Sequence, residues 1–139
     1  MAEHLGWDDI VVGRQATVDF VVTPENMLQF AALSGDLNPL HLDTEFAQKR
    51  GFQGQVVYGA MLIAKVSQLI GMKLPGRDSV WSTISMNFHR PLYVNQNAQL
   101  MATVVSLSKA TKMVEMKITI HAMEKLLAKG KTEVMLVAP

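Results

Sequence analysis

Residues 15–22 (QATVDFVV) alternate between polar and apolar side chains, and Val18, Phe20 and Val22 fall on the same face. This period of two is typical of a strand with one buried face. A helix is expected directly after the strand. Residues 23–25 (TPE) combine a hydroxyl N-cap, a proline at the first helical position and a carboxylate in the first turn.

The helix should end at Gly35, because glycine readily adopts the left-handed conformation that closes a helix. Residues 36–42 (DLNPLHL) are not expected to continue it, since Pro39 disfavours the helical conformation of the residue before it. Asp43 then predicts the N-cap of a short helix over residues 44–50.

Residues 57–70 are expected to form a long buried helix. Apolar side chains occur on almost every face of this segment, and Lys65 is its only charged residue. A helix that is hydrophobic all round lies inside a protein. Gly71 is expected to close it.

Residues 80–88 return to a period of two, which indicates another strand. Residues 91–97 (PLYVNQN) contain turn-forming residues. Further strands are expected near residues 98–107, 113–122 and 132–138. The connections between them are short, and short connections favour antiparallel pairing.

This order of elements predicts the α+β class. A curled antiparallel sheet wrapped around one long buried helix would bury the apolar faces of both, and that architecture is a single hot-dog fold. Such a sheet leaves edge strands, and pairing across a dimer would cover one of them.

The composition supports one domain over residues 1–139. Apolar residues make up 49% of the chain and charged residues 18%, which excludes a disordered protein. The net charge of +1 gives no electrostatic footprint for nucleic acid or for an anionic membrane. Ten methionines and the low charge favour an oligomer, although a methionine-rich core is the alternative.

The absence of cysteine excludes disulfides and a cysteine nucleophile, and it is consistent with a reducing compartment. Residues 1–9 do not resemble a signal or transit peptide. The longest apolar run, residues 56–64, is shorter than the roughly 18 residues of a membrane span. We therefore expect a cytoplasmic protein.

Asp36 and His41 lie five residues apart in the proline-containing segment after the first helix, which allows both side chains to face one point. A carboxylate and an imidazole together form a general acid–base pair for water. Ser34 and Asn38 are expected to hold the loop by side-chain-to-backbone hydrogen bonds. Spacing alone leaves the alternative that Asp36 is an Asx-turn residue and His41 a semi-buried histidine with its hydrogen bonds satisfied.

Residues 30–47 resemble the signature of the MaoC-like, or (R)-specific enoyl-CoA hydratase, family. The signature reads here as an aromatic residue followed by LSGDLNPLH at residues 33–41 and a small residue at Ala47. Residues 56–76 resemble the central helix and following loop of that family, and residues 79–94 are similar to its next strand.

This resemblance implies a hot-dog fold, a homodimer and a catalytic pair made of Asp36 and His41. The implied reaction is reversible syn addition of water to a trans-2-enoyl thioester, which gives the (R)-3-hydroxyacyl product. Asp36 is interpreted as the base, and His41 as the partner that orients water and moves the proton. The expected substrate is an acyl-CoA or acyl-carrier-protein thioester, with no cofactor and no metal.

The same resemblance places a backbone donor for the thioester carbonyl at Gly59, where the long helix begins. The alternative for this glycine is close packing of helix and sheet. Tyr58, Asn38 and Ser34 are the other expected substrate-binding residues. Residues 58–61 (YGAM) depart from the usual His-Gly-Met-Leu of the family.

A second departure is Ala64, which stands where serine is frequent in the family. These departures bear on the substrate, because they lie where the acyl chain and the pantetheine are expected to pass.

Two other functions are weighed against the hydratase. A hot-dog thioesterase often takes a carboxylate from the long helix, whereas residues 56–72 contain no Asp or Glu. A non-catalytic acyl-thioester-binding or assembly protein is expected to have lost the acid–base pair, whereas Asp36 and His41 are both present.

The remaining charged and metal-ligating residues predict no further site. The three lysines within residues 125–131 are interpreted as a solvated hairpin end rather than as a site for CoA phosphates. His4, His89 and His121 are scattered along the chain, so we expect no metal centre. We expect His121 to be exposed to solvent.

Overall fold

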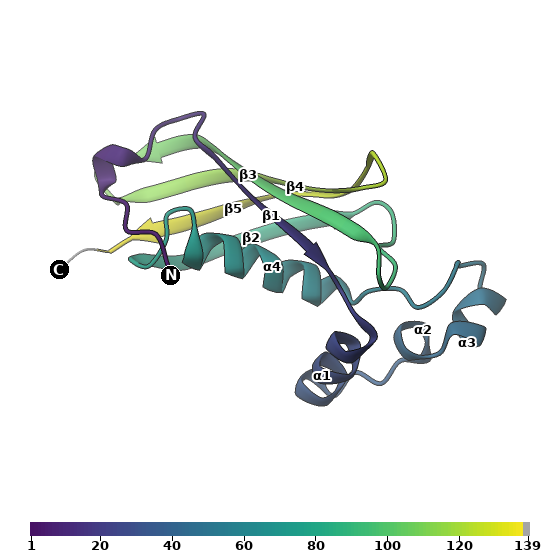
Figure 1. Ribbon diagram of the computed structural model, residues 1–139. Coiled ribbons are helices and arrows are strands. Elements are labelled where there is room, and N and C mark those ends of the chain that lie inside the picture. Colours follow the sequence, from purple (N-terminus) through teal and green to yellow (C-terminus); the bar gives the residue numbers. More distant parts are fainter. Residues whose placement is uncertain (138–139) are drawn as a thin grey trace.

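The computed structural model describes residues 1–137 and consists of one antiparallel sheet with a long helix against one face (Figure 1). The strands are β1 (Gln15–Val21), β2 (Ser79–Phe88), β3 (Asn97–Ser108), β4 (Met113–Ala122) and β5 (Lys125–Leu136). The helices are the 3-10 helix η1 (Trp7–Asp9) and the α-helices α1 (Pro24–Ser34), α2 (Pro39–Leu42), α3 (Thr44–Lys49) and α4 (Gly59–Met72). The predicted α+β arrangement is confirmed.

The strands are ordered β1-β3-β4-β5-β2, so β1 and β2 form the two edges. All neighbouring strands are antiparallel, as the short connections predicted. The core lies between the sheet and α4. The predicted apolar faces of two strands are buried there, and they consist of Val18, Phe20, Val22, Val114, Met116, Ile118, Ile120 and Ala122.

The first helices follow the capping pattern of the sequence. Thr23 Oγ1 accepts a hydrogen bond from Asn26 N at 3.1 Å, and Asn26 Oδ1 accepts one from Thr23 N at 3.0 Å. Gly35 ends α1 in the left-handed conformation, with a φ of 76°. Asp43 caps α3 by accepting a hydrogen bond from Phe46 N at 3.1 Å.

Two helix boundaries differ from the prediction. Residues 39–42 form the short helix α2, because Pro39 is well suited to a first helical position even though it ends the helix before it. The helix α4 begins at Gly59 rather than at residue 57, and it continues through Gly71 to Met72. Gly71 does not adopt a positive φ, so it does not act as the expected stop.

The start of the last strand was predicted wrongly. β5 begins at Lys125 rather than at residue 132, and the predicted end at residue 138 lies outside the described residues. Met123 and Glu124 make the turn before it, with φ angles of 53° and 62°. Two-residue hairpin turns favour such angles, but Asn and Gly usually supply them. The lysines of residues 125–131 therefore lie along a strand, with only the first at the hairpin end.

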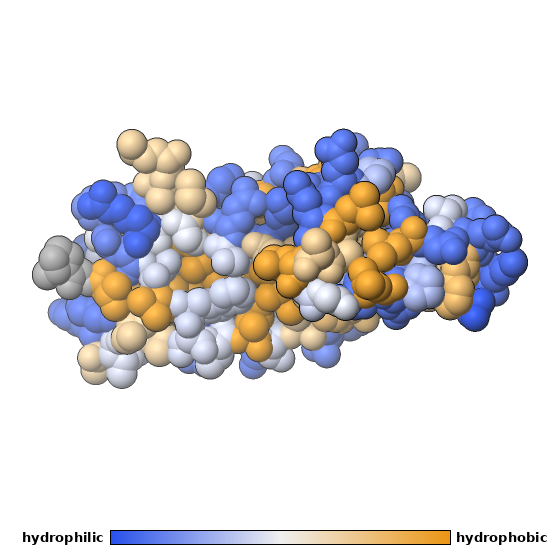
Figure 2. Space-filling view, turned by 90° about the horizontal axis from the view of Figure 1, so that it is seen from below, coloured by the Kyte–Doolittle hydropathy of each residue, from blue (hydrophilic) through white to orange (hydrophobic). Residues whose placement is uncertain are grey.

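The helix α4 is buried on one side only, which corrects the prediction of a helix inside the protein. Leu62, Val66 and Leu69 pack against the sheet, whereas Ala60 and Ala64 are exposed. The reason is geometric, because one five-stranded sheet covers one face of a helix. Figure 2 shows hydrophobic side chains gathered in patches along the face that carries α4 and α1.

The edge strand β2 shows the same incomplete burial. Its predicted apolar face is half-buried at Ile84 and Met86, but Val80 is 47% exposed and Phe88 49% exposed.

No helix among residues 1–137 is long and apolar enough to cross a lipid bilayer.

Candidate active site

The loop that carries Asp36 is held by its own polar side chains. Asp36 N donates to Ser34 Oγ at 3.1 Å, and Leu40 N donates to Asn38 Oδ1 at 3.1 Å. These bonds confirm that Ser34 and Asn38 hold the loop, and their predicted contact with substrate stays a prediction. Asn38 N also donates to Asp36 Oδ1 at 3.0 Å. Asp36 therefore does form an Asx turn, while its exposed side chain remains accessible to solvent.

His41 is half-buried and is held by a backbone carbonyl. Its Nδ1 lies 2.6 Å from Val56 O. A carbonyl oxygen only accepts, so Nδ1 carries the hydrogen. In the neutral ring Nε2 then carries no hydrogen, so it is the nitrogen left for the acid–base role that the sequence predicts. The sequence carried no signal for Val56, because its backbone makes the contact.

Tyr58 connects the two halves of the predicted pair. Its side chain is 2% exposed, and its hydroxyl donates to Asp36 O at 2.6 Å. Its ring stacks on His41 with centroids 4.0 Å apart, and Phe30 packs on it with centroids 4.7 Å apart. The structure therefore brings Asp36 and His41 together around one buried tyrosine.

Gly59 is the first residue of α4, where the family resemblance places it, rather than the third residue of a helix that begins at residue 57. No side chain caps this end of the helix, although Met61 N of the first turn donates to Tyr58 O at 3.0 Å. Gly59 N and Ala60 N precede it and are the candidate donors for an oxygen. A Cβ at Gly59 would lie 3.3 Å from the ring of Phe88. The glycine thus fits both the close packing of helix and sheet and the role of a backbone donor. It packs closely on β2, and it has no side chain that would cover its own backbone N–H.

Burial, and after it the negative charge of Asp36, raises the pKa of Tyr58 above its ordinary value of 10.0. The unfolded chain therefore releases this proton first, so the free energy of unfolding should fall as the pH rises above about 10. We expect the stability difference between wild type and Tyr58→Phe to become smaller between about pH 9 and pH 11. Urea unfolding of both proteins checks this, and a constant difference would contradict it.

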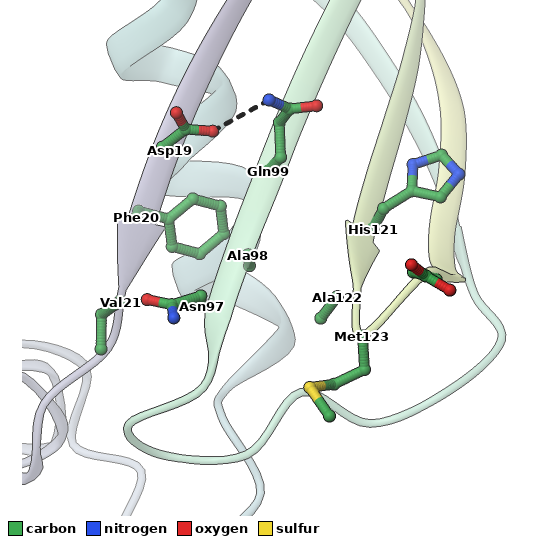
Figure 3. Close-up of a pocket in the computed structure, with 10 residues that line it drawn as sticks. Asp19, Phe20, Val21, Asn97, Ala98, Gln99, His121, Ala122 and Met123 are labelled. Carbon is green, nitrogen blue, oxygen red and sulfur yellow. Dashed lines mark hydrogen bonds between the residues drawn. The ribbon is translucent and has the colours of Figure 1, made fainter.

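A broad hollow of the described surface lies elsewhere. About 700 Å³ of open space lies at the ends of β1, β3 and β4, where Asp19 accepts a hydrogen bond from Gln99 Nε2 at 3.0 Å (Figure 3). His121 borders this hollow and is exposed, as expected. Neither Asp36 nor His41 lines it, so this hollow is separate from the predicted acid–base pair.

Comparison with known proteins supplies the family. The sequence profile described as MaoC like domain matches residues 11–125. An (R)-specific enoyl-CoA hydratase from Aeromonas caviae is 35% identical over 69% of this chain and 72% of that protein. An (R)-specific enoyl-CoA hydratase from Rhodospirillum rubrum is 26% identical over 95% of this chain and 92% of that protein.

Two solved structures share the fold. The (R)-hydratase from A. caviae involved in PHA biosynthesis has a TM-score of 0.89 at 30% identity, covering 92% of this chain and 98% of that chain. An R-hydratase from Pseudomonas aeruginosa in the unliganded form has a TM-score of 0.92 at 24% identity, covering 99% and 89%. The predicted hot-dog fold is therefore confirmed.

Proposed function

Because the chain belongs to the MaoC-like hydratase and dehydratase family, we propose that it adds water reversibly to a trans-2-enoyl thioester. The product is the (R)-3-hydroxyacyl thioester. The observation that carries the proposal is that Tyr58 contacts both the Asp36 backbone carbonyl and the His41 imidazole, next to the uncapped start of α4. An acid–base pair beside free backbone donors is what addition of water to a conjugated carbonyl requires.

In the proposed mechanism, the carboxylate of Asp36 takes a proton from water as the water oxygen bonds to C3. His41 orients this water and, in its imidazolium form, transfers the proton on Nε2 to C2. Val56 O keeps Nδ1 as a donor in both protonation states of the ring. One proton then moves from Asp36 back to His41 to complete the cycle, and the two transfers together add one water.

The negative charge that develops on the thioester oxygen needs fixed donors. The backbone N–H groups at the start of α4, with Gly59 first, supply them together with the helix dipole. Without a side chain at residue 59, the carbonyl can approach the backbone closely. Removing one donor of this kind from an enzyme typically lowers kcat by about 10²–10³-fold.

An absorbance assay at the enoyl-thioester band tests the proposed reaction, because hydration removes the conjugation. The assay uses crotonyl, hexenoyl, octenoyl and branched substrates, each on CoA and on an acyl carrier protein. Loss of absorbance with at least one substrate is expected, and the pattern shows chain length and carrier. No loss with any substrate favours a non-catalytic acyl-thioester-binding or assembly protein. Release of free thiol instead would favour a thioesterase.

We further propose a homodimer in the cytoplasm that forms through the edge strand β2. The support is the exposure of Val80 and Phe88 on β2, and of Leu33 (84%) and Leu37 (68%) close to Asp36 in the chain. Sedimentation at micromolar concentration should show twice 15.4 kDa. A 15.4 kDa species would contradict the dimer.

Two matched lysine variants locate the interface. Val80→Lys places a charge on β2 and should shift the protein toward monomer. Val21→Lys places the same charge at a 39% exposed valine on the opposite edge strand, and it should leave the mass unchanged. A shift with Val21→Lys alone would assign the interface to β1.

A further inference from the structure

The segment immediately before α4 holds the acid–base loop, residues 36–41, at three points. Val56 N donates a hydrogen bond to Leu40 O at 3.2 Å, and Val56 O accepts one from Nδ1 of His41 at 2.6 Å. Two residues later, the Tyr58 hydroxyl donates to Asp36 O at 2.6 Å. The first two contacts use the backbone of residue 56, so only the third depends on the identity of a side chain in this segment.

We propose that Tyr58 is the positioning residue that sets the acid–base pair relative to the start of α4. This role rests on the proposed function and adds a side chain that touches no reacting atom. Gly59, the first donor of the helix, follows Tyr58 directly in the chain. The Tyr58 side chain holds the Asp36 backbone by its hydroxyl and the His41 ring by stacking. One residue therefore joins the groups that activate water to the group that binds the thioester oxygen.

The hydroxyl of Tyr58 is not itself available for proton transfer. The side chain is 2% exposed, and its hydrogen is engaged by Asp36 O. Its raised pKa keeps the hydroxyl protonated, and therefore a donor, throughout the neutral range. Phe30 covers another part of the ring, so the tyrosine has little freedom to turn toward a substrate. These contacts assign Tyr58 to support and not to contact with the acyl group.

Tyr58→Phe removes the hydroxyl and keeps the ring, so it isolates the hydrogen bond to Asp36. We expect kcat for the best enoyl thioester to fall roughly three- to tenfold, the effect of one lost hydrogen bond. KM should stay within about twofold, because the substrate does not touch the hydroxyl. Tyr58→His keeps an aromatic ring and an N–H donor, and it should retain more activity than Tyr58→Leu, which has neither.

Tyr93→Phe is the matched control. The Tyr93 hydroxyl also bonds to a backbone group, as it accepts from Gln53 N at 3.1 Å, but it contacts neither Asp36 nor His41. This variant also loses one hydroxyl that bonds to a backbone group, and it should leave kcat unchanged. If kcat falls equally in Tyr93→Phe and Tyr58→Phe, the fall reflects a general loss of stability. That result would overturn the positioning role of Tyr58.

Amide hydrogen exchange provides a second readout that needs no catalysis. Exchange of residues 36–41 should become faster in Tyr58→Phe and stay unchanged in Tyr93→Phe, because only the first releases the loop. If wild type hydrates no substrate, the proposed function fails, and the exchange data still decide whether Tyr58 holds the loop. Unchanged exchange together with unchanged kcat in a folded Tyr58→Phe protein would overturn the inference. If Tyr58→Leu does not fold, the kcat and exchange data of Tyr58→Phe alone decide whether Tyr58 positions the acid–base pair.

Discussion

Replacing Asp36 by asparagine is expected to lower kcat by at least about a hundredfold, which corresponds to about 2.7 kcal/mol of lost transition-state stabilisation. The amide cannot take a proton from water, whereas its oxygen can still accept the hydrogen bond that Asp36 Oδ1 receives from Asn38 N. The Asx turn is therefore kept while the base is removed. KM should change little if the start of α4 and contacts to the acyl chain carry binding and KM approximates a dissociation constant.

Asp43→Asn is the control for this substitution. Asp43 lies seven residues further along, and its Oδ1 accepts a backbone hydrogen bond from Phe46 N at 3.1 Å. Asparagine keeps that cap as well, so Asp43→Asn should retain wild-type kcat. Thermal melts of both variants separate lost chemistry from lost folding. Wild-type turnover in folded Asp36→Asn would show that Asp36 only shapes the turn.

His41→Ala should also lower kcat by at least about a hundredfold, because it removes the group that orients water and protonates C2. The double variant Asp36→Asn/His41→Ala should be far less impaired than the product of the two single effects. Both groups act on one water, so the second loss removes little that the first has left. Kinetics of the two single variants and the double variant measure this coupling.

His121→Ala is the control for the histidine, since His121 is exposed on the outer face of the sheet. It should leave kcat unchanged. His41 also packs on Tyr58, so His41→Ala is expected to lower the melting temperature too. Turnover per folded molecule is therefore the quantity to compare. Multiplicative single effects would mean that Asp36 and His41 act in separate steps.

The local elements follow from local signals in the sequence. The strand period predicted the buried faces of β1 and β4, because side chains two apart in a strand lie on the same face. Thr23 and Asp43 cap the helices they precede, since a cap bonds to a backbone N–H only three residues away. The loop-holding bonds of Ser34 and Asn38 span two residues each, and they were predictable for the same reason.

Errors arose where a local preference was weak. The turn before β5 uses Met123 and Glu124 in left-handed conformations, and neither residue marks such a turn. The extensive pairing of β5 with both β4 and β2 stabilises that turn from outside it. Gly71 likewise stays helical, since glycine can adopt helical as well as left-handed angles, and α4 continues to Met72.

By itself the sequence determined the order of the elements, the α+β class and the candidate pair of Asp36 and His41. Tertiary structure alone decided how that pair is held. Tyr58 reaches Asp36 across 22 residues, and Val56 reaches His41 across 15 residues. No periodic pattern encodes such contacts, because they form only when packing of the chain brings distant segments together. The ring nitrogen of His41 that the backbone leaves free and the open side of α4 both follow from that packing, and composition and spacing do not contain them.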